Sequence, residues 1–198
     1  MTTTILSWVA VGLLLVTSVG LLLSRDWRWS LGFLAAQYLG MFWMVSLHWP
    51  FGLASIKLVT GWMAAAALGV THMDLPEDEE TEVSSLPSGR LFRMIAVAII
   101  LVLVIAGTSA VEKIIPGVSR PVIAGGLLLA GMGVLLLGIS AGLLKIILGL
   151  LTVMAGFEIL YATVETSILL AGLLTTINLG LALAGAYLMT AAPKEDEE

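Results

Sequence analysis

Residues 91–110 read LFRMIAVAIILVLVIAGTSA, a run of 20 residues in which Arg93 carries the only charge. A helix of this length rises about 30 Å, which matches the hydrocarbon core of a bilayer. Apolar runs of similar length recur at 4–23, 29–48, 51–71, 121–140, 142–163 and 167–189. The sequence therefore predicts an all-α, polytopic membrane bundle of about seven transmembrane helices.

The composition of the whole chain favours the same class. Of its 198 residues, 59% are hydrophobic and 12% are charged, and the mean hydropathy is +1.07. Soluble domains are closer to half apolar and about 25% charged. This difference excludes a soluble enzyme, a nucleic-acid-binding protein and a disulfide-stabilised secreted domain.

Cofactor sites are not predicted. The chain has no cysteine, which excludes thiolate metal sites and iron–sulfur clusters. Its two histidines, His48 and His72, are expected at opposite sides of the membrane, where they could not ligate one haem. We expect neither a metal nor a cofactor.

Lysine and arginine predict the orientation, because both are enriched on the cytoplasmic side of membrane proteins. With the N-terminus outside, more of these residues fall on the inner side than on the outer side. The inner ones are Arg25, Arg28, Arg90, Arg93, Lys145 and Lys194, and the outer ones are Lys113 and Arg120. This asymmetry predicts N-out, C-in in the cell membrane, which is the inner membrane of a prokaryote.

A polar stretch around residues 73–90 divides the chain. It contains the acidic run PEDEE at 76–80 and then serine, proline and glycine, as is typical of a solvated loop. We expect a three-helix N-terminal part (1–72), an acidic cytoplasmic loop (73–90), a four-helix C-terminal part (91–190) and an acidic tail (191–198).

Glycines form two regular stripes in the last two spans. Gly142, Gly149 and Gly156 recur every seven residues, and Gly172 and Gly180 lie eight residues apart on one helix face. Small residues let helices approach closely in lipid. Both stripes therefore predict tight packing of the last three helices against each other.

Polar side chains within the spans are the candidates for chemistry, because each is costly in hydrocarbon. Lys57 near the start of the third span and Glu158 near the end of the sixth fall at similar depth. Either they form an ion pair in which Glu158 exchanges protons, or Lys57 reaches the headgroups and Glu158 faces a wet edge. Gln37 and Tyr38 in the second span are expected to form hydrogen bonds across helices.

Asn178, in the middle of the seventh span, is the third candidate. Asn178 and Glu158 lie roughly opposite the small residues of their own helices. If the small faces pack within the chain, these polar groups point outward. That arrangement favours a contact with another protein.

The N-terminal part resembles the hydrogenase-4 component E family. The resemblance rests on LVTS at 15–18, RDWR at 25–28, SLGFLAAQ at 30–37 and SIKLV at 55–59, whose Lys57 stands where the family has a lysine. Residues 121–190 are similar to the C-terminal part of that family. They are also similar to subunit K (chain 4L) of NADH-quinone oxidoreductase and to its small counterpart in multisubunit cation/proton antiporters. This similarity rests on LLK at 143–145, Gly149, Gly156 and LGLAL at 179–183.

The chain departs from this resemblance at two acidic positions. The family's glutamate aligns with Met154, one turn before Glu158 on the same face, and its second acid aligns with Thr176, two residues before Asn178. Glu158 can replace the first acid, whereas the amide of Asn178 cannot exchange protons as a carboxylate does. The resemblance implies a proton path through Glu158, with Lys57 and Asn178 as further candidates, and without the second acid.

The resemblance implies a non-redox integral membrane subunit of a respiratory NADH dehydrogenase-like or hydrogenase-4-like complex that contributes to proton translocation. Its expected partners are membrane lipids and antiporter-like and other membrane subunits, and not nucleic acid. The chain alone is not expected to be an enzyme, because redox centres would belong to other subunits. The alternative is a standalone small membrane carrier or a lipid-interacting scaffold without proton chemistry.

Overall fold

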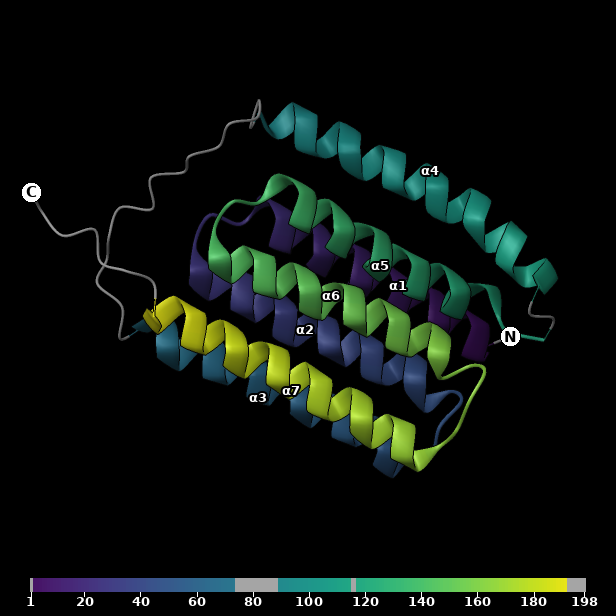
Figure 1. Ribbon diagram of the computed structural model, residues 1–198. Helices are drawn as coiled ribbons and strands as arrows, with labels where there is room; N and C mark the ends of the chain where they lie inside the picture. Colours follow the sequence, from purple (N-terminus) through teal and green to yellow (C-terminus); the bar gives the residue numbers. More distant parts are fainter. Residues whose placement is uncertain (1, 74–88, 115–116, 192–198) are drawn as a thin grey trace, which may run out of the picture.

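The computed structural model describes residues 2–73, 89–114 and 117–191. These residues form seven α-helices (Figure 1), in agreement with the predicted spans. The helices are α1 (Thr2–Leu23), α2 (Trp27–Ser46), α3 (Phe51–Met73), α4 (Arg90–Ile114), α5 (Arg120–Ile139), α6 (Leu143–Tyr161) and α7 (Ile168–Ala191). Apart from their first and last residues, the predicted acidic loop and tail lie outside the described residues.

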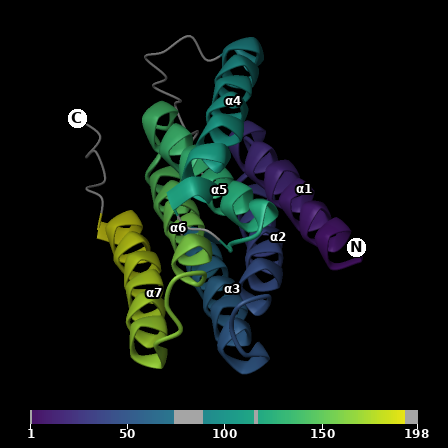
Figure 2. The same cartoon turned by 90° about the vertical axis from the view of Figure 1, so that its right-hand side faces the viewer.

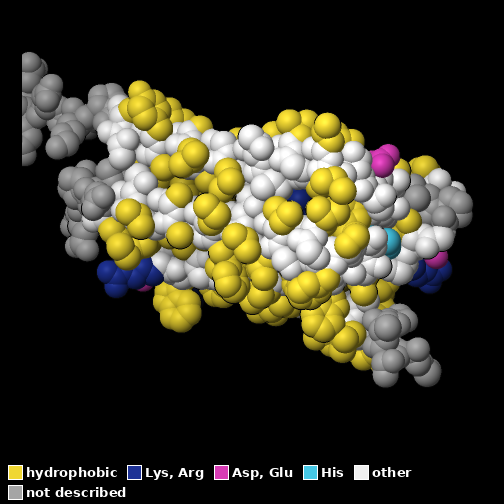
Figure 3. All heavy atoms as spheres, turned by 90° about the horizontal axis from the view of Figure 1, so that it is seen from below, with side chains coloured by type: hydrophobic (Ala, Val, Ile, Leu, Met, Phe, Trp, Pro, Cys, Tyr) yellow, Lys and Arg dark blue, Asp and Glu magenta, His cyan; other side chains and the backbone are white. Residues whose placement is uncertain are grey.

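Six of the helices, all except α2, are long and apolar enough to cross a membrane. The chain is therefore a multi-pass, all-α membrane protein. Helix α2 is long enough but less apolar, and it packs against α1, α3 and α6. Figure 3 shows hydrophobic side chains over most of one face of the molecule, with lysine and arginine side chains grouped near both ends.

Short connections set the alternating direction of the helices. Asp26 begins α2 as an N-cap, its carboxylate accepting a hydrogen bond from Arg28 N at 2.9 Å. The turn between α2 and α3 contains Pro50, and residues 140–142 separate α5 from α6. Gly117, in the short connection before α5, has a φ of 98°, a conformation that glycine adopts without strain.

The two ends of the bundle differ in charge. We call one the basic end, because it carries Arg25, Arg28, Arg90, Arg93 and Lys145. The end of α1 lies there, where Arg93 Nη1 donates to Leu22 O at 3.1 Å and Lys145 Nζ to Ser24 O at 2.7 Å. Cationic groups stabilise the carbonyls at a helix C-terminus. These contacts attach α4 and α6 to α1 at this end.

Helices α5 and α6 approach each other most closely, and glycines make this possible. A Cβ atom on Gly126 would lie 3.1 Å from Gly156 O, and one on Gly133 would lie 2.9 Å from Gly149 O. Two glycine pairs thus bring the backbones into contact. Helix α4 lies outside this pair against α5, and α7 lies beside α3 and α6 (Figures 1 and 2).

The packing expected from the glycine stripes holds only in part. Gly149 and Gly156 do face α5, but Gly142 lies at the exposed N-cap of α6 with open space beside it. The expectation for α7 needs correction, because Gly172 and Gly180 are exposed and no neighbouring atom lies within 4 Å of the position of a Cβ. A stripe of small residues can face lipid at little cost, so spacing alone did not determine which side packs.

Gly156→Ala should destabilise the bundle, because the new methyl would meet Ala130 N at 2.5 Å and Gly126 O at 2.7 Å. We expect a loss of about 1–3 kcal/mol in the free energy of unfolding, measured by thermal unfolding in detergent. Gly180→Ala is the matched control, since it adds the same methyl group in open space. Equal unfolding midpoints for the two variants would contradict the close contact between α5 and α6.

Candidate functional site

An ion pair lies buried where α3, α6 and α7 meet. Lys57 Nζ is 2.8 Å from Glu158 Oε1, and both side chains are only 1% exposed. Of the two arrangements that the sequence left open, the structure has the ion pair. Lys57 does not extend to the surface, and Glu158 does not face a wet edge.

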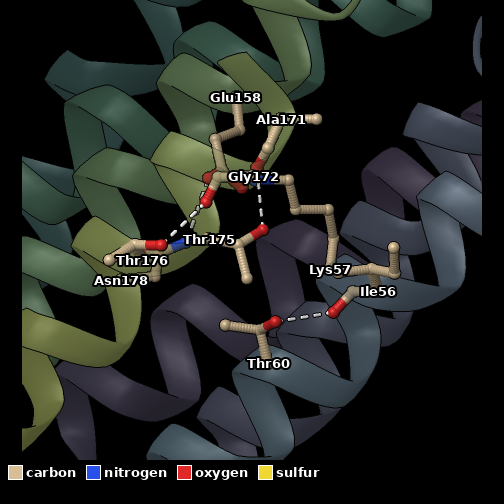
Figure 4. A network of polar contacts seen from close by, with 9 residues as sticks. All are labelled: Ile56, Lys57, Thr60, Glu158, Ala171, Gly172, Thr175, Thr176 and Asn178. Carbon is tan, nitrogen blue, oxygen red and sulfur yellow. Dashed lines mark hydrogen bonds and ion pairs between the residues drawn. The ribbon is translucent and has the colours of Figure 1, made fainter. Parts of the chain in front are cut away.

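Both charged groups have further hydrogen bonds, which come from α7 (Figure 4). Lys57 Nζ donates to Ala171 O at 3.0 Å, and Asn178 Nδ2 donates to Glu158 Oε1 at 3.0 Å. Thr175 Oγ1 also donates to Ala171 O, at 2.8 Å. The three predicted site residues therefore form one network that joins three helices.

Two oxygen atoms of this network have no partner among the described residues. They are Glu158 Oε2 and Asn178 Oδ1, both of them buried. Oε1 of Glu158, in contrast, accepts from both Lys57 and Asn178. The carboxylate is thus held through one oxygen, while the other is left for a further donor.

Small residues on α3 make room for the lysine. The buried face of this helix carries Ala54, Gly61 and Ala64 on either side of Lys57. These residues keep α3 close to α7 while the long side chain of Lys57 extends between the helices. The lysine is fully enclosed because its neighbours on the same face are short.

The outward orientation expected for Glu158 and Asn178 is wrong. Asn178 is fully buried, and it lies on the inner face of α7 with Ala171, Leu174 and Ala182, whereas Gly172 and Gly180 lie on the exposed face. Burying a polar side chain beside a hydrogen-bonding partner costs less than exposing it to hydrocarbon. The partner, Lys57, is distant in sequence, so the faces of α7 alone did not reveal this orientation.

Tyr38 adds a group to the site that the sequence did not connect with it. Its ring packs directly on Gly61 of α3, one turn from Lys57, and Tyr38 lies within range of a direct electrostatic interaction with Glu158. Its hydroxyl and the amide of Gln37 are fully buried, yet neither has the cross-helix hydrogen bond that we expected within the described part of the chain. The spacing of Lys57 and Gly61 was the only sequence signal.

A contact between two connections holds the end of the site that lies away from the basic end. Trp49, in the turn between α2 and α3, is buried and donates from Nε1 to Glu165 O at 3.0 Å. Glu165 lies in the loop between α6 and α7. The hydrogen bond therefore ties this loop to the start of α3, which fixes the helices that carry Lys57, Glu158 and Asn178.

The site offers proton chemistry more readily than metal binding. In the parts of the chain that the structure describes, no three His, Asp or Glu side chains gather as metal ligands would. Comparison with known protein families, curated proteins and solved structures finds no match to the chain. Function must therefore be inferred from the ion pair and from the residues that carry the resemblance.

Removing one partner of the ion pair should destabilise the protein strongly. Lys57→Met or Glu158→Leu leaves a buried charge without its counterion, and such a loss costs about 3–5 kcal/mol. The double variant should be less destabilised than the sum of the two single variants, because it leaves no buried charge. Thermal unfolding of all four proteins in detergent measures this coupling.

The exposed pair of Arg120 and Glu112 is the matched control. Its atoms are 2.9 Å apart, but the side chains are 69% and 36% exposed, so water screens their attraction. Arg120→Met should barely change the unfolding midpoint. Additive effects of the Lys57 and Glu158 substitutions would show that the two charges do not depend on each other.

Proposed function

We propose that this chain is a non-redox membrane subunit of a respiratory NADH dehydrogenase-like or hydrogenase-4-like complex, in which the ion pair relays protons. The observation that carries the proposal is the enclosed pair of Lys57 and Glu158, 2.8 Å apart. Ionisable residues inside a membrane are rare and expensive, and they commonly mark ion or proton pathways. The resemblance to component E and subunit K supports the same kind of complex.

The relay can be written as a sequence of protonation steps. A proton that reaches Glu158 Oε2 neutralises the carboxylate, and Lys57 is then left charged in a low-dielectric core without its counterion. This state favours release of a proton from Lys57 Nζ to a further acceptor. When Glu158 and Lys57 return to their charged forms, one proton has entered and one has left.

Asn178 would act as a positioning residue in this relay. Its amide donates to Glu158 Oε1, the atom that also contacts Lys57, so the carboxylate keeps its second oxygen turned toward an incoming proton. An asparagine holds one orientation of the carboxylate but does not itself exchange a proton. This role matches the loss of the family's second acid at the neighbouring Thr176.

Under this proposal, the basic end faces the cytoplasm of a prokaryotic cell, as expected from the positive-inside rule. Lys57 and Glu158 then lie nearer the outer surface than the inner one. The proposal includes antiporter-like and other membrane subunits as partners and assigns redox chemistry to other chains. Since the polar faces of α6 and α7 point inward, the expected partners rest on the resemblance alone.

Purification of the tagged chain from its native membrane in mild detergent tests the assembly. Mass spectrometry should identify large antiporter-like membrane subunits together with hydrophilic redox subunits. A tagged, unrelated membrane protein from the same membranes controls for adventitious capture. Recovery of the chain alone, stable and monodisperse, would overturn the complex and favour a standalone carrier or lipid-interacting scaffold.

Glu158→Gln tests the relay, since glutamine keeps the shape of the side chain but cannot take up a proton. We expect proton pumping by the assembled complex in vesicles to fall by roughly 10²-fold, the scale of losing a positioned proton-transfer group. The set of proteins in the purified complex should be unchanged. Glu165→Gln, at an exposed loop acid, should pump normally. Undiminished pumping by Glu158→Gln would remove this residue from the path.

A further inference from the structure

The core contains more buried polar atoms than the ion pair needs. Among the described residues, no partner is found for Ser18 Oγ, both amide atoms of Gln37, Tyr38 Oη and Glu158 Oε2. All four side chains are at most 3% exposed. Folded proteins rarely leave such groups unpaired, and ordered water commonly supplies the missing hydrogen bonds.

These polar groups lie at successive depths between the basic end and the ion pair. Counted from that end, Ser18 is five residues from the end of α1, Gln37 is ten from the start of α2 and Glu158 is fifteen from the start of α6. At 1.5 Å per residue, their Cα atoms lie about 8, 15 and 22 Å along their helices. Tyr38 follows Gln37 directly.

The groups also face the same interior. Leu14 and Met44 both approach Gly125 of α5, with side-chain atoms 3.3 and 3.7 Å from the position of its Cβ. Ser18 follows Leu14 by one turn on the same face of α1, and Gln37 precedes Met44 by seven residues on the same face of α2. Ser18 and Gln37 therefore lie on converging faces, both nearer to the basic end than Gly125.

Tyr38 continues this series toward the ion pair. Its ring contacts Gly61 of α3, and it lies within electrostatic range of Glu158. The phenol can donate one hydrogen bond and accept another, and the amide of Gln37 has both donors and an acceptor. These groups can thus hold water molecules in a continuous chain of hydrogen bonds.

We propose that ordered water molecules bridge Ser18, Gln37, Tyr38 and Glu158, and that they form a hydrated path from the basic end to the ion pair. Steps of about 7 Å along the bundle correspond to one or two waters each, at oxygen separations near 2.8 Å. The presence of these waters does not depend on the proposed function. Their use as the proton supply of Glu158 Oε2 rests on it.

Radiolytic hydroxyl labelling of the full chain in lipid nanodiscs tests the path. X-rays convert bound water into hydroxyl radicals that oxidise the nearest side chains, so Tyr38 should be labelled although it is buried. Tyr187, which is 69% exposed, is the positive control. Met132, which is 2% exposed in apolar surroundings, is the negative control. A labelling rate of Tyr38 at or below that of Met132 would overturn the proposal.

Two variants test whether the water depends on the residues named. Gln37→Leu should reduce labelling of Tyr38 at least threefold, while labelling of Tyr187 stays constant. Ser18→Ala, a smaller change, should also reduce it and covers the case in which Gln37→Leu does not fold. Unchanged labelling of Tyr38 in a folded variant would exclude that residue from the path. Because labelling reports water and not pumping, a normal rate of pumping by Glu158→Gln would leave this result standing.

Discussion

The free-energy cost of a charge removed from water is the constraint on which the arrangement of this bundle depends. Neither Lys57 nor Glu158 is tolerable alone in the core, so the helices that carry them must meet, although the two residues lie 101 positions apart. Asn178 and the carbonyl of Ala171 complete the network from α7. One ion pair thereby fixes the mutual placement of α3 and α6, and it determines which face of α7 turns inward.

Close backbone packing gives this network a rigid support. Gly126 with Gly156, and Gly133 with Gly149, bring α5 and α6 into contact along most of their length. Glu158 follows Gly156 by only two residues, so the same contact that holds the helix also places the carboxylate. At the nearby loop, Trp49 and Glu165 restrain the start of α7. A hydrogen-bonded ion pair needs this precision, because small shifts in distance weaken it sharply in a low-dielectric core.

The sequence predicted the helices and the similar depth of Lys57 and Glu158, since both follow from run lengths and positions within runs. It did not predict the rotation of α7, because a smooth face can pack against a helix or face lipid. Gly172 and Gly180 suggested the first, and the structure has the second. The approach of Tyr38 to Glu158 was also not predictable, since it depends on α2 packing beside α6, and helix order is not encoded in local patterns.

A hydrated path from the basic end would reach Glu158 from one side only. At the opposite end, Trp49 is buried and closes the turn by its hydrogen bond to Glu165. A relay with access from a single end can load and unload a proton but cannot move it across the membrane. Under the proposed function, the proton from Lys57 must therefore leave sideways. Thr176, where the related subunits carry an acid, lies on the exposed face of α7, so the next acceptor would have to come from a neighbouring subunit. The missing acid thus makes translocation a property of the complex, and the chain alone should hold protons without conducting them.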